Sequence, residues 1–354
     1  MSAARILTTL ACLALLLPGP ARAGDASVIP FPFLFYMPET KFGGGATVLV
    51  FLRGDDPEVR PSMISPILIY TAKRQTMLYL TGELYLDREA WRLDFVGGYS
   101  NYPDTFWGLG NDAPDAAEED FTPRRALLNL SLKRRVAPAL YVGGRFDFAR
   151  RTMRESEAGG LLDTAAIPGV CDGNVVSAGL SVTHDDRDST TFPRSGGFRD
   201  LILTVAGGGL GGDYDYRAFR LNAMHFHAHS ESSVLAAEII AEARSDEPPF
   251  DMLGQLGGDT LLRGDYAGRY RDRNLLACQA EWRRHLWRRL GGVVFAGVGE
   301  VSRDIGDFTL NGLHAAGGFG IRFLLDEQEG LNLRADWGFG EGSSGFYLNL
   351  GEAF

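Results

Sequence analysis

The amino-acid sequence predicts an all-β fold, a transmembrane antiparallel β-barrel of about 16 strands. First, apolar and polar residues alternate along most of the chain, as where Leu331, Leu333 and Ala335 are separated by Asn332 and Arg334. A period of two is typical of strands with one apolar face. Second, such segments recur about 16 times. Third, the polar positions hold full charges beside glycines, which indicates a polar lumen and not the outer surface of a soluble sandwich.

The strands and their connections follow the order typical of such a barrel. An even number of strands brings both chain ends to the same side of the membrane, and the connections at residues 101–123, 154–174 and 245–273 are long. The turn at 87–90 is short, which fits long outer loops and short periplasmic turns. Residues 53–62 make a turn that is long for its side. We expect the strands to begin near Val28, Gly44, Met63, Thr76, Trp91, Arg124, Ala139, Val175, Gly197, Tyr214, Ser233, Asn274, Gly292, Leu313, Gly330 and Gly345.

The N-terminus has the parts of a secretory signal peptide. Arg5 precedes an apolar run over residues 6–17, and Ala-Arg-Ala at 21–23 provides a cleavage site with small residues. The run is too short to span a membrane. We therefore expect a signal peptide at residues 1–23 and a barrel over residues 24–354, located in the outer membrane of a Gram-negative bacterium.

Composition excludes several classes of protein. The formal net charge of −10 argues against a nucleic-acid partner, because binding to phosphates requires a basic surface. Beyond the signal peptide only Cys171 and Cys278 remain, so the chain has no disulfide framework. No later stretch approaches the 18 consecutive apolar residues of a transmembrane helix.

The stretch 256–286 organises the rest of the chain. It is a long Gly- and Arg-rich loop that continues into an alternating strand. Loops of this length inside a compact protein are usually functional or disordered. Its arginines are too many to bury without carboxylate partners. We expect this sixth outer loop to fold back into the polar interior, with Arg263 at its tip.

The motif Leu262-Arg263-Gly264-Asp265 resembles a tetrad in the sixth loop of the BamA/TamA-like outer-membrane barrels, an assembly and secretion superfamily also called bacterial surface antigens. The family tetrad is hydrophobic-Arg-Gly-aromatic. Asp265 stands at the aromatic position, and Tyr266 follows one place later. The resemblance implies a loop arginine that is held by acidic groups on strands twelve and thirteen. It covers the barrel alone, so the expected member lacks the family's POTRA domains.

Glu281 is the expected partner of Arg263. Residues 280–283 (AEWR) are similar to the family's strand-twelve Glu-aromatic-Arg pattern. The family's second acidic residue lies in a Phe-x-Asp-x-Gly segment, and residues 295–299 (FAGVG) hold Gly297 at that position. We therefore expect Arg263 to be paired once. A generic polar lining of the lumen is the alternative interpretation.

A second motif resembles the family's strand-eight turn, Asp-x-Arg-Asp followed by Pro and Gly. It comprises Asp185, Arg187, Asp188, Pro193 and Gly196. The physical interpretation is a periplasmic hairpin in which Asp accepts hydrogen bonds from its own turn and Pro fixes φ. The simplest expectation is a solvated turn whose role is limited to geometry.

The two ends of the barrel sheet carry unusual residues. Pro30 and Pro32 each remove a ladder donor, and Gly351 in the last strand can kink. We expect the first and last strands to share fewer hydrogen bonds than any other neighbouring pair. The C-terminal Phe354 is aromatic and shares the spacing of residues 346–350, which resembles the terminal-strand signal of outer-membrane proteins.

The resemblance implies insertion or translocation of outer-membrane proteins or components, with membrane lipids, client proteins or a periplasmic protein as partners. A passive pore or structural barrel remains open. We find no hydrolase elbow, zinc-protease motif or phosphate loop, so we predict no catalytic residue and no cofactor. A barrel hydrolase built from separate strands is a weaker alternative. The histidines at 225, 227 and 229 share a strand face, but we predict a membrane-boundary position for them and no metal site.

Overall fold

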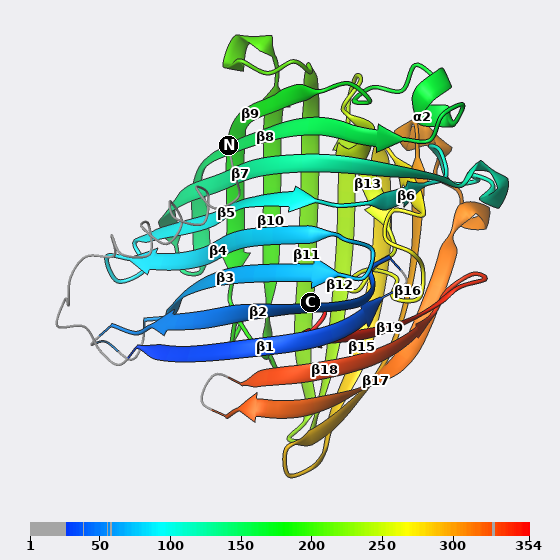
Figure 1. The fold of residues 1–354 in the computed structure, drawn as a ribbon. Coiled ribbons are helices and arrows are strands. Elements are labelled where there is room, and N and C mark those ends of the chain that lie inside the picture. The colour runs from blue at the N-terminus through cyan, green and yellow to red at the C-terminus, as the bar shows by residue number, and fades with distance from the viewer. Residues whose placement is uncertain (1–25, 38, 55, 57–58, 328–329) are drawn as a thin grey trace.

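The computed structural model describes residues 26–37, 39–54, 56, 59–327 and 330–354, so the expected signal peptide at residues 1–23 lies outside the described residues. Within this part of the chain the fold is an all-β, nearly closed antiparallel barrel of 16 strands (Figure 1). No helix among the described residues is long and apolar enough to cross a membrane.

The barrel wall is built from strands of seven to 19 residues. They are β1 (Ser27–Met37), β2 (Lys41–Leu52), β3 (Ser62–Thr71), β4 (Thr76–Leu86), β5 (Trp91–Asn101), β7 (Glu119–Ala137), β8 (Leu140–Ser156), β9 (Gly173–Asp185), β10 (Gly196–Ala206), β11 (Tyr216–Ser230), β12 (Ser233–Arg244), β15 (Asn274–Trp287), β16 (Leu290–Ser302), β17 (His314–Asp326), β18 (Leu331–Phe339) and β19 (Ser344–Leu350). The connections hold β6 (Asp104–Phe106), β13 (Gly254–Leu256), β14 (Tyr270–Asp272) and the short helix α2 (Leu161–Thr164).

Every wall strand pairs antiparallel with the next along the chain. The strand starts agree with the sequence expectation to within five residues, and the largest difference is at β7. That strand begins at Glu119 because its first residues pair with β6 and β8 beyond the expected start at Arg124. Alternation of apolar and polar residues was therefore enough to locate the wall.

The two faces of the wall differ as the alternation predicts. On β15, Leu276 and Trp282 are exposed on the outside, whereas Glu281 and Arg283 are buried inside. The histidines of segment 225–229 are also exposed on the outer face. The apolar outer face suits a hydrocarbon environment, and the charged inner face requires partners within the lumen.

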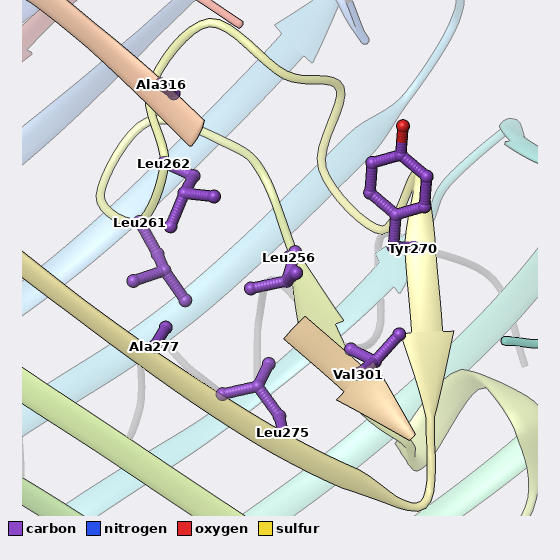
Figure 2. Close-up of a cluster of buried hydrophobic side chains, with 8 residues drawn as sticks. All are labelled: Leu256, Leu261, Leu262, Tyr270, Leu275, Ala277, Val301 and Ala316. Atoms are coloured by element: carbon purple, nitrogen blue, oxygen red, sulfur yellow. The ribbon is translucent and has the colours of Figure 1, made fainter. Parts of the chain in front are cut away.

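The connection between β12 and β15, residues 245–273, is called loop six here. It folds into the ring of strands, where the yellow segment of Figure 1 crosses the interior. Its apolar side chains pack on the inner wall formed by β15, β16 and β17 (Figure 2). The cluster comprises Leu256, Leu261, Leu262, Tyr270, Leu275, Ala277, Val301 and Ala316.

Among the residues that the structure describes, no backbone ladder joins the first and last strands of the barrel. β1 pairs with β2 along its whole length, and β19 pairs with β18. The blue β1 and the red β19 lie side by side (Figure 1), yet the described residues form no ladder between them. We call this junction the seam. At its short-turn end it is held by side chains, because Leu350 packs beside Leu49 and Phe51.

Candidate functional site

Loop six enters the lumen as an ordered hairpin. β13 and β14 pair through Gln255 and Arg271, and the amide of Gly268 donates to the carbonyl of Leu256 at 2.8 Å. Buried apolar residues of the loop then pack on the wall (Figure 2). Backbone pairing and apolar packing therefore both hold the loop inside the barrel.

The tip of loop six touches the barrel wall backbone to backbone. A Cβ atom added to Gly264, where φ is +130°, would lie 2.5 Å from the amide nitrogen of Gly340. Any side chain at Gly338 would likewise overlap the carbonyl group of Arg263. The amide of Gly264 donates to the hydroxyl of Tyr347 on β19 at 3.0 Å. Glycine is therefore required on both surfaces of this contact.

This contact places Arg263 among two carboxylates and a ring. Its Nη1 donates to Oδ2 of Asp336 on β18 at 2.6 Å, and its Nη2 pairs with Glu281 on β15. The guanidinium carbon lies 3.6 Å from the ring centroid of Phe295, a cation–π contact. All three ionic side chains are fully buried.

The Glu281 pairing that the sequence predicts is present, but the expectation that Arg263 is paired once is wrong. Asp336 on the fifteenth wall strand supplies a second carboxylate in place of the one absent at Gly297. The lumen allows this because strands far apart in sequence face each other across it. A guanidinium can be shared by two acceptors, since its donors form a planar fork.

Arg263 belongs to a larger group, which we call the arginine cluster. Each further arginine lies within ion-pair distance of a member carboxylate: Arg283 Nε to Glu281 at 2.7 Å, Arg322 Nη1 to Asp336 at 2.5 Å and Arg334 Nη2 to Asp259 at 3.2 Å. Glu352 accepts from Arg322 at 2.7 Å. Four arginines and four carboxylates make the cluster formally neutral. Its members are Arg263, Arg283, Arg322, Arg334, Asp259, Glu281, Asp336 and Glu352.

The last residues of the chain complete this cluster. At Gly351, φ is +78° and the strand turns into the lumen, so Glu352 reaches Arg322. The carbonyl of Phe354 accepts from Arg283 at 2.7 Å, and the Phe354 ring lies 5.3 Å from that guanidinium. The expectation that Phe354 shares one face with Phe346, Leu348 and Leu350 is wrong, because the left-handed residue Gly351 interrupts the period of two.

The turn after β9 is more than a solvated turn. Asp185 is fully buried and binds three arginines: Arg187 at 2.8 Å, Arg60 at 3.0 Å and Arg92 at 3.1 Å. Arg60 comes from the unexpectedly long turn between β2 and β3, so that length serves to reach Asp185 across the lumen. The expectation of a role limited to geometry is therefore wrong for Asp185.

The other residues of this motif do form the turn. Asp188 Oδ1 accepts from the amides of Arg194 at 2.9 Å and Ser195 at 3.2 Å. Pro193 is buried, and Gly196 has a φ of +87° where a Cβ would overlap the carbonyl of Asp186. The motif thus combines one residue that links strands across the lumen with others that shape a hairpin.

Tyr266, which follows the tetrad by one place, contacts the connection between β5 and β7. Tyr266 donates its hydroxyl to Oδ1 of Asp104 at 3.1 Å and packs edge-to-face on Trp107. Asp265, at the family's aromatic position, accepts from the Ser343 hydroxyl at 3.0 Å. The tip is therefore held by a polar contact on one side and an aromatic contact on the other.

Two further anchors of loop six were missed by sequence reasoning. Asp251 binds Arg125 of β7 and Arg151 of β8, each at 2.5 Å, and these arginines hold the pKa of Asp251 below its usual range despite burial. Glu39, between β1 and β2, accepts from the amide of Ala267 at 2.6 Å. Burial raises the pKa of Glu39 to about 7. Neither residue belongs to a recognisable motif, so no local pattern could have found them.

We predict that Arg263 and Glu281 are energetically coupled. Arg263→Ala leaves two buried carboxylates short of a partner and should cost about 3–5 kcal/mol of folding stability. Adding Glu281→Gln should recover part of that loss, which urea unfolding of the purified barrel in detergent would measure. Strictly additive losses in the double variant would contradict the pairing.

Substitution of Asp185 should reduce folding stability far more than substitution of Asp188 in the same turn. Asp185→Asn removes the charge that holds three arginines and should cost about 3–5 kcal/mol. The matched control Asp188→Asn keeps an acceptor for the turn amides and should change stability by about 0.5 kcal/mol or less. Equal effects of the two variants in the same unfolding assay would show that Asp185 acts only through turn geometry.

Stability should fall as pH rises through the range set by Glu39. Its pKa is raised from 4.5 to about 7 on folding, so the protonated carboxyl is favoured in the folded state. Its contribution is complete below pH 4.5 and is lost as pH rises through about 7, a change of about 3 kcal/mol. Glu39→Gln keeps an acceptor for Ala267 and should remove this part of the pH profile. An unchanged profile in that variant would refute the assignment to Glu39.

Comparisons with known proteins agree with this architecture. The family model "Omp85 superfamily domain" matches residues 172–354, just over half of the chain. No curated protein matches the sequence.

Three solved structures share the fold. BamA from Haemophilus ducreyi lacking POTRA domains 1–3 has a TM-score of 0.62 at 11% identity and covers 92% of this chain and 70% of its own. CdiB from Acinetobacter baumannii has a TM-score of 0.59 at 11% identity, with 92% and 60% covered. CdiB from Escherichia coli has a TM-score of 0.59 at 12% identity, with 92% and 61% covered. With its inward loop, its buried tip arginine and this family match, the chain belongs to the Omp85 superfamily of outer-membrane barrels.

Proposed function

We propose that this barrel inserts or translocates outer-membrane proteins and that its seam is the route. The observation that carries the proposal is the absence of a ladder between β1 and β19 among the described residues. Each of these strands presents one edge of unpaired amides and carbonyls, and such an edge can pair with a strand of another chain. The client would be an unfolded barrel strand or a secreted segment.

Opening the seam costs less than opening any other junction of the wall. β17 and β18 would have to break a ladder from Gly317–Phe339 to Asp326–Leu331, whereas β1 and β19 have no ladder to break. Contacts such as Leu350 on Leu49 can separate and reform against another apolar surface. Pro30 and Pro32 lower the number of donors that β1 can offer, which disfavours permanent closure.

In this proposal the arginine cluster keeps one side of the seam rigid. It joins loop six to β15, β17, β18 and the turned C-terminus, so the last strands move as a unit. Within β1, β2 and β3, Lys41 is the one charged residue, and the turn between β2 and β3 adds the ion pair of Arg60 with Asp185. Ion pairs within the strands themselves therefore restrain the first strands less than the last ones. The first strands would therefore be the moving side.

The remaining expectations fit the same proposal. Residues 1–23 would be cleaved as a signal peptide during export, which leaves residues 24–354 as the mature barrel. Phe354 would contribute to recognition during assembly before it docks on Arg283. Partners would be membrane lipids and client proteins, with a periplasmic protein supplying them. Omp85 barrels insert or translocate proteins and are not enzymes, and we propose no catalytic role or cofactor for this chain.

A passive pore is the second candidate, and one observation favours it. Loop six and its clusters occupy the lumen as a plug would, and nothing in that arrangement requires the seam to part. The two candidates differ in what happens when the seam is locked. A plugged pore would be unaffected, whereas an insertion barrel would stop working.

Locking the seam with a disulfide should abolish function. Leu34→Cys and Leu348→Cys lie on opposite sides of the seam and border the same surface hollow. In a background without Cys171 and Cys278, the oxidised pair should stop insertion of a client barrel into proteoliposomes, and reduction should restore it. Full activity of the oxidised protein would show that insertion does not require the seam to open.

A matched control separates cross-linking from seam closure. Phe319→Cys and Trp337→Cys join β17 to β18, which already pair at that position. Oxidation there should leave insertion unchanged. Ion conductance in planar bilayers would be recorded for both proteins, because a passive pore predicts the same conductance with and without the seam disulfide.

A further inference from the structure

The inner face of the first strands is mostly apolar and, apart from Lys41 at the start of β2, carries no charged residue, and its inward Thr47 and Ser65 hydrogen-bond to each other at 2.8 Å. Phe33 and Phe35 of β1 face inward, as do Met63 and Ile67 of β3. The opposite face of the same strands is apolar as well, with Leu68 exposed on the outside. Apolar surface left in contact with water costs about 25 cal/mol for each Å² exposed, so this wall is stabilised by any hydrocarbon that covers it.

The apolar wall encloses a cavity of about 450 Å³. It extends from Met37 and Met77 near the long loops to Leu350 near the short turns. Asp259 of loop six and Asn349 form its polar rim, and they bond to each other. This volume falls within the range of about 300–1,000 Å³ typical of small-molecule sites.

A second hollow lies on the outer side of the same seam. It also has a volume of about 450 Å³, and its lining includes Leu34, Tyr36, Phe346 and Leu348. Phe35 borders both spaces. Because no backbone ladder separates β1 from β19 among the described residues, the inner cavity is divided from the bilayer by side chains alone.

We propose that the inner cavity binds one acyl chain of a membrane phospholipid, which enters from the bilayer through the seam. An acyl chain that moves from the bilayer into an apolar cavity changes little in solvation free energy, because both surroundings are hydrocarbon. The net favourable free energy comes from the cavity wall, which the acyl chain removes from water. The second acyl chain of the lipid remains in the outer hollow.

A polypeptide segment fits this cavity less well. Apart from the seam edge of β1, the backbone of β1 to β4 is paired within the wall, so the interior of the cavity offers side chains and not a ladder edge. A peptide placed there would leave its own amides and carbonyls without partners, at a cost of several kcal/mol. An acyl chain has no such groups. The site is therefore distinct from the strand edges used in the proposed function, and either proposal can fail without the other.

The test is photo-crosslinking in vesicles of phosphatidylcholine that carry a diazirine near the end of one acyl chain. After illumination, labelled residues are mapped by mass spectrometry of the digested barrel. We expect adducts at inward residues such as Phe33, Met63 and Ile67 in addition to outward residues such as Leu68. Adducts confined to outward residues would overturn the proposal.

Two variants show whether the label reports the cavity. Ile67→Trp fills it and should lower labelling of Phe33 and Met63 at least tenfold, whereas Leu68→Trp on the outer face should leave that labelling unchanged. Circular dichroism and heat-modifiable migration would confirm that both variants fold. Equal inward labelling in the two variants would overturn the site.

A final measurement identifies the lipid class in the native membrane. Barrel purified from outer membranes in mild detergent is analysed for bound lipid by native mass spectrometry. We expect the wild type and Leu68→Trp to retain about one phospholipid each, and Ile67→Trp to retain several-fold less. Retention of lipid A in place of phospholipid, or of neither, would overturn the assignment.

Discussion

The structure depends on the charge balance around Arg263. A guanidinium in the middle of a barrel is stable only when carboxylates replace the water it loses, and here Glu281 and Asp336 do so. Those carboxylates also bind Arg283 and Arg322; Arg322 also donates to Glu352, and Arg283 to the carbonyl of Phe354. Removal of Arg263 leaves Glu281 and Asp336 each with one buried partner fewer. The sixth loop, the late strands and the chain terminus are therefore parts of a single electrostatic unit.

This unit makes the two sides of the seam physically different. The last strands are joined to the loop by buried ion pairs, which are strong only while all members stay in place. The first strands are joined to the rest through ladders and apolar contacts, with Glu39 as a polar link to the loop and Arg60, in the turn between β2 and β3, as an ionic link to Asp185. Even a small movement of a strand would break its buried ion pairs. An apolar surface can instead exchange one hydrocarbon partner for another as the strand moves. A seam with such unequal sides can part without disturbing the lumen charges.

Much of the fold, but less of the site, could be predicted from sequence. Period-two alternation depends only on which face of a strand is buried, so the wall strands were found to within five residues. The ion pair of Arg263 with Glu281 could be predicted because both residues lie in motifs. Asp336 could be placed inward by parity, but its pairing across the lumen depends on barrel curvature and loop path. The same is true of Asp185 with Arg60. Phe354 was misplaced because one left-handed glycine ended the alternation.

The electrostatic unit requires that loop six be held inside the barrel as firmly as the wall itself. Residue-resolved hydrogen exchange of the barrel in detergent micelles measures this directly. The amides of Gly264 and Ala267, which donate to Tyr347 and Glu39, should exchange as slowly as amides in the centre of β15. Exchange of these two amides at the rates of an exposed loop would contradict an anchored tip, and with it the electrostatic unit on which the structure depends.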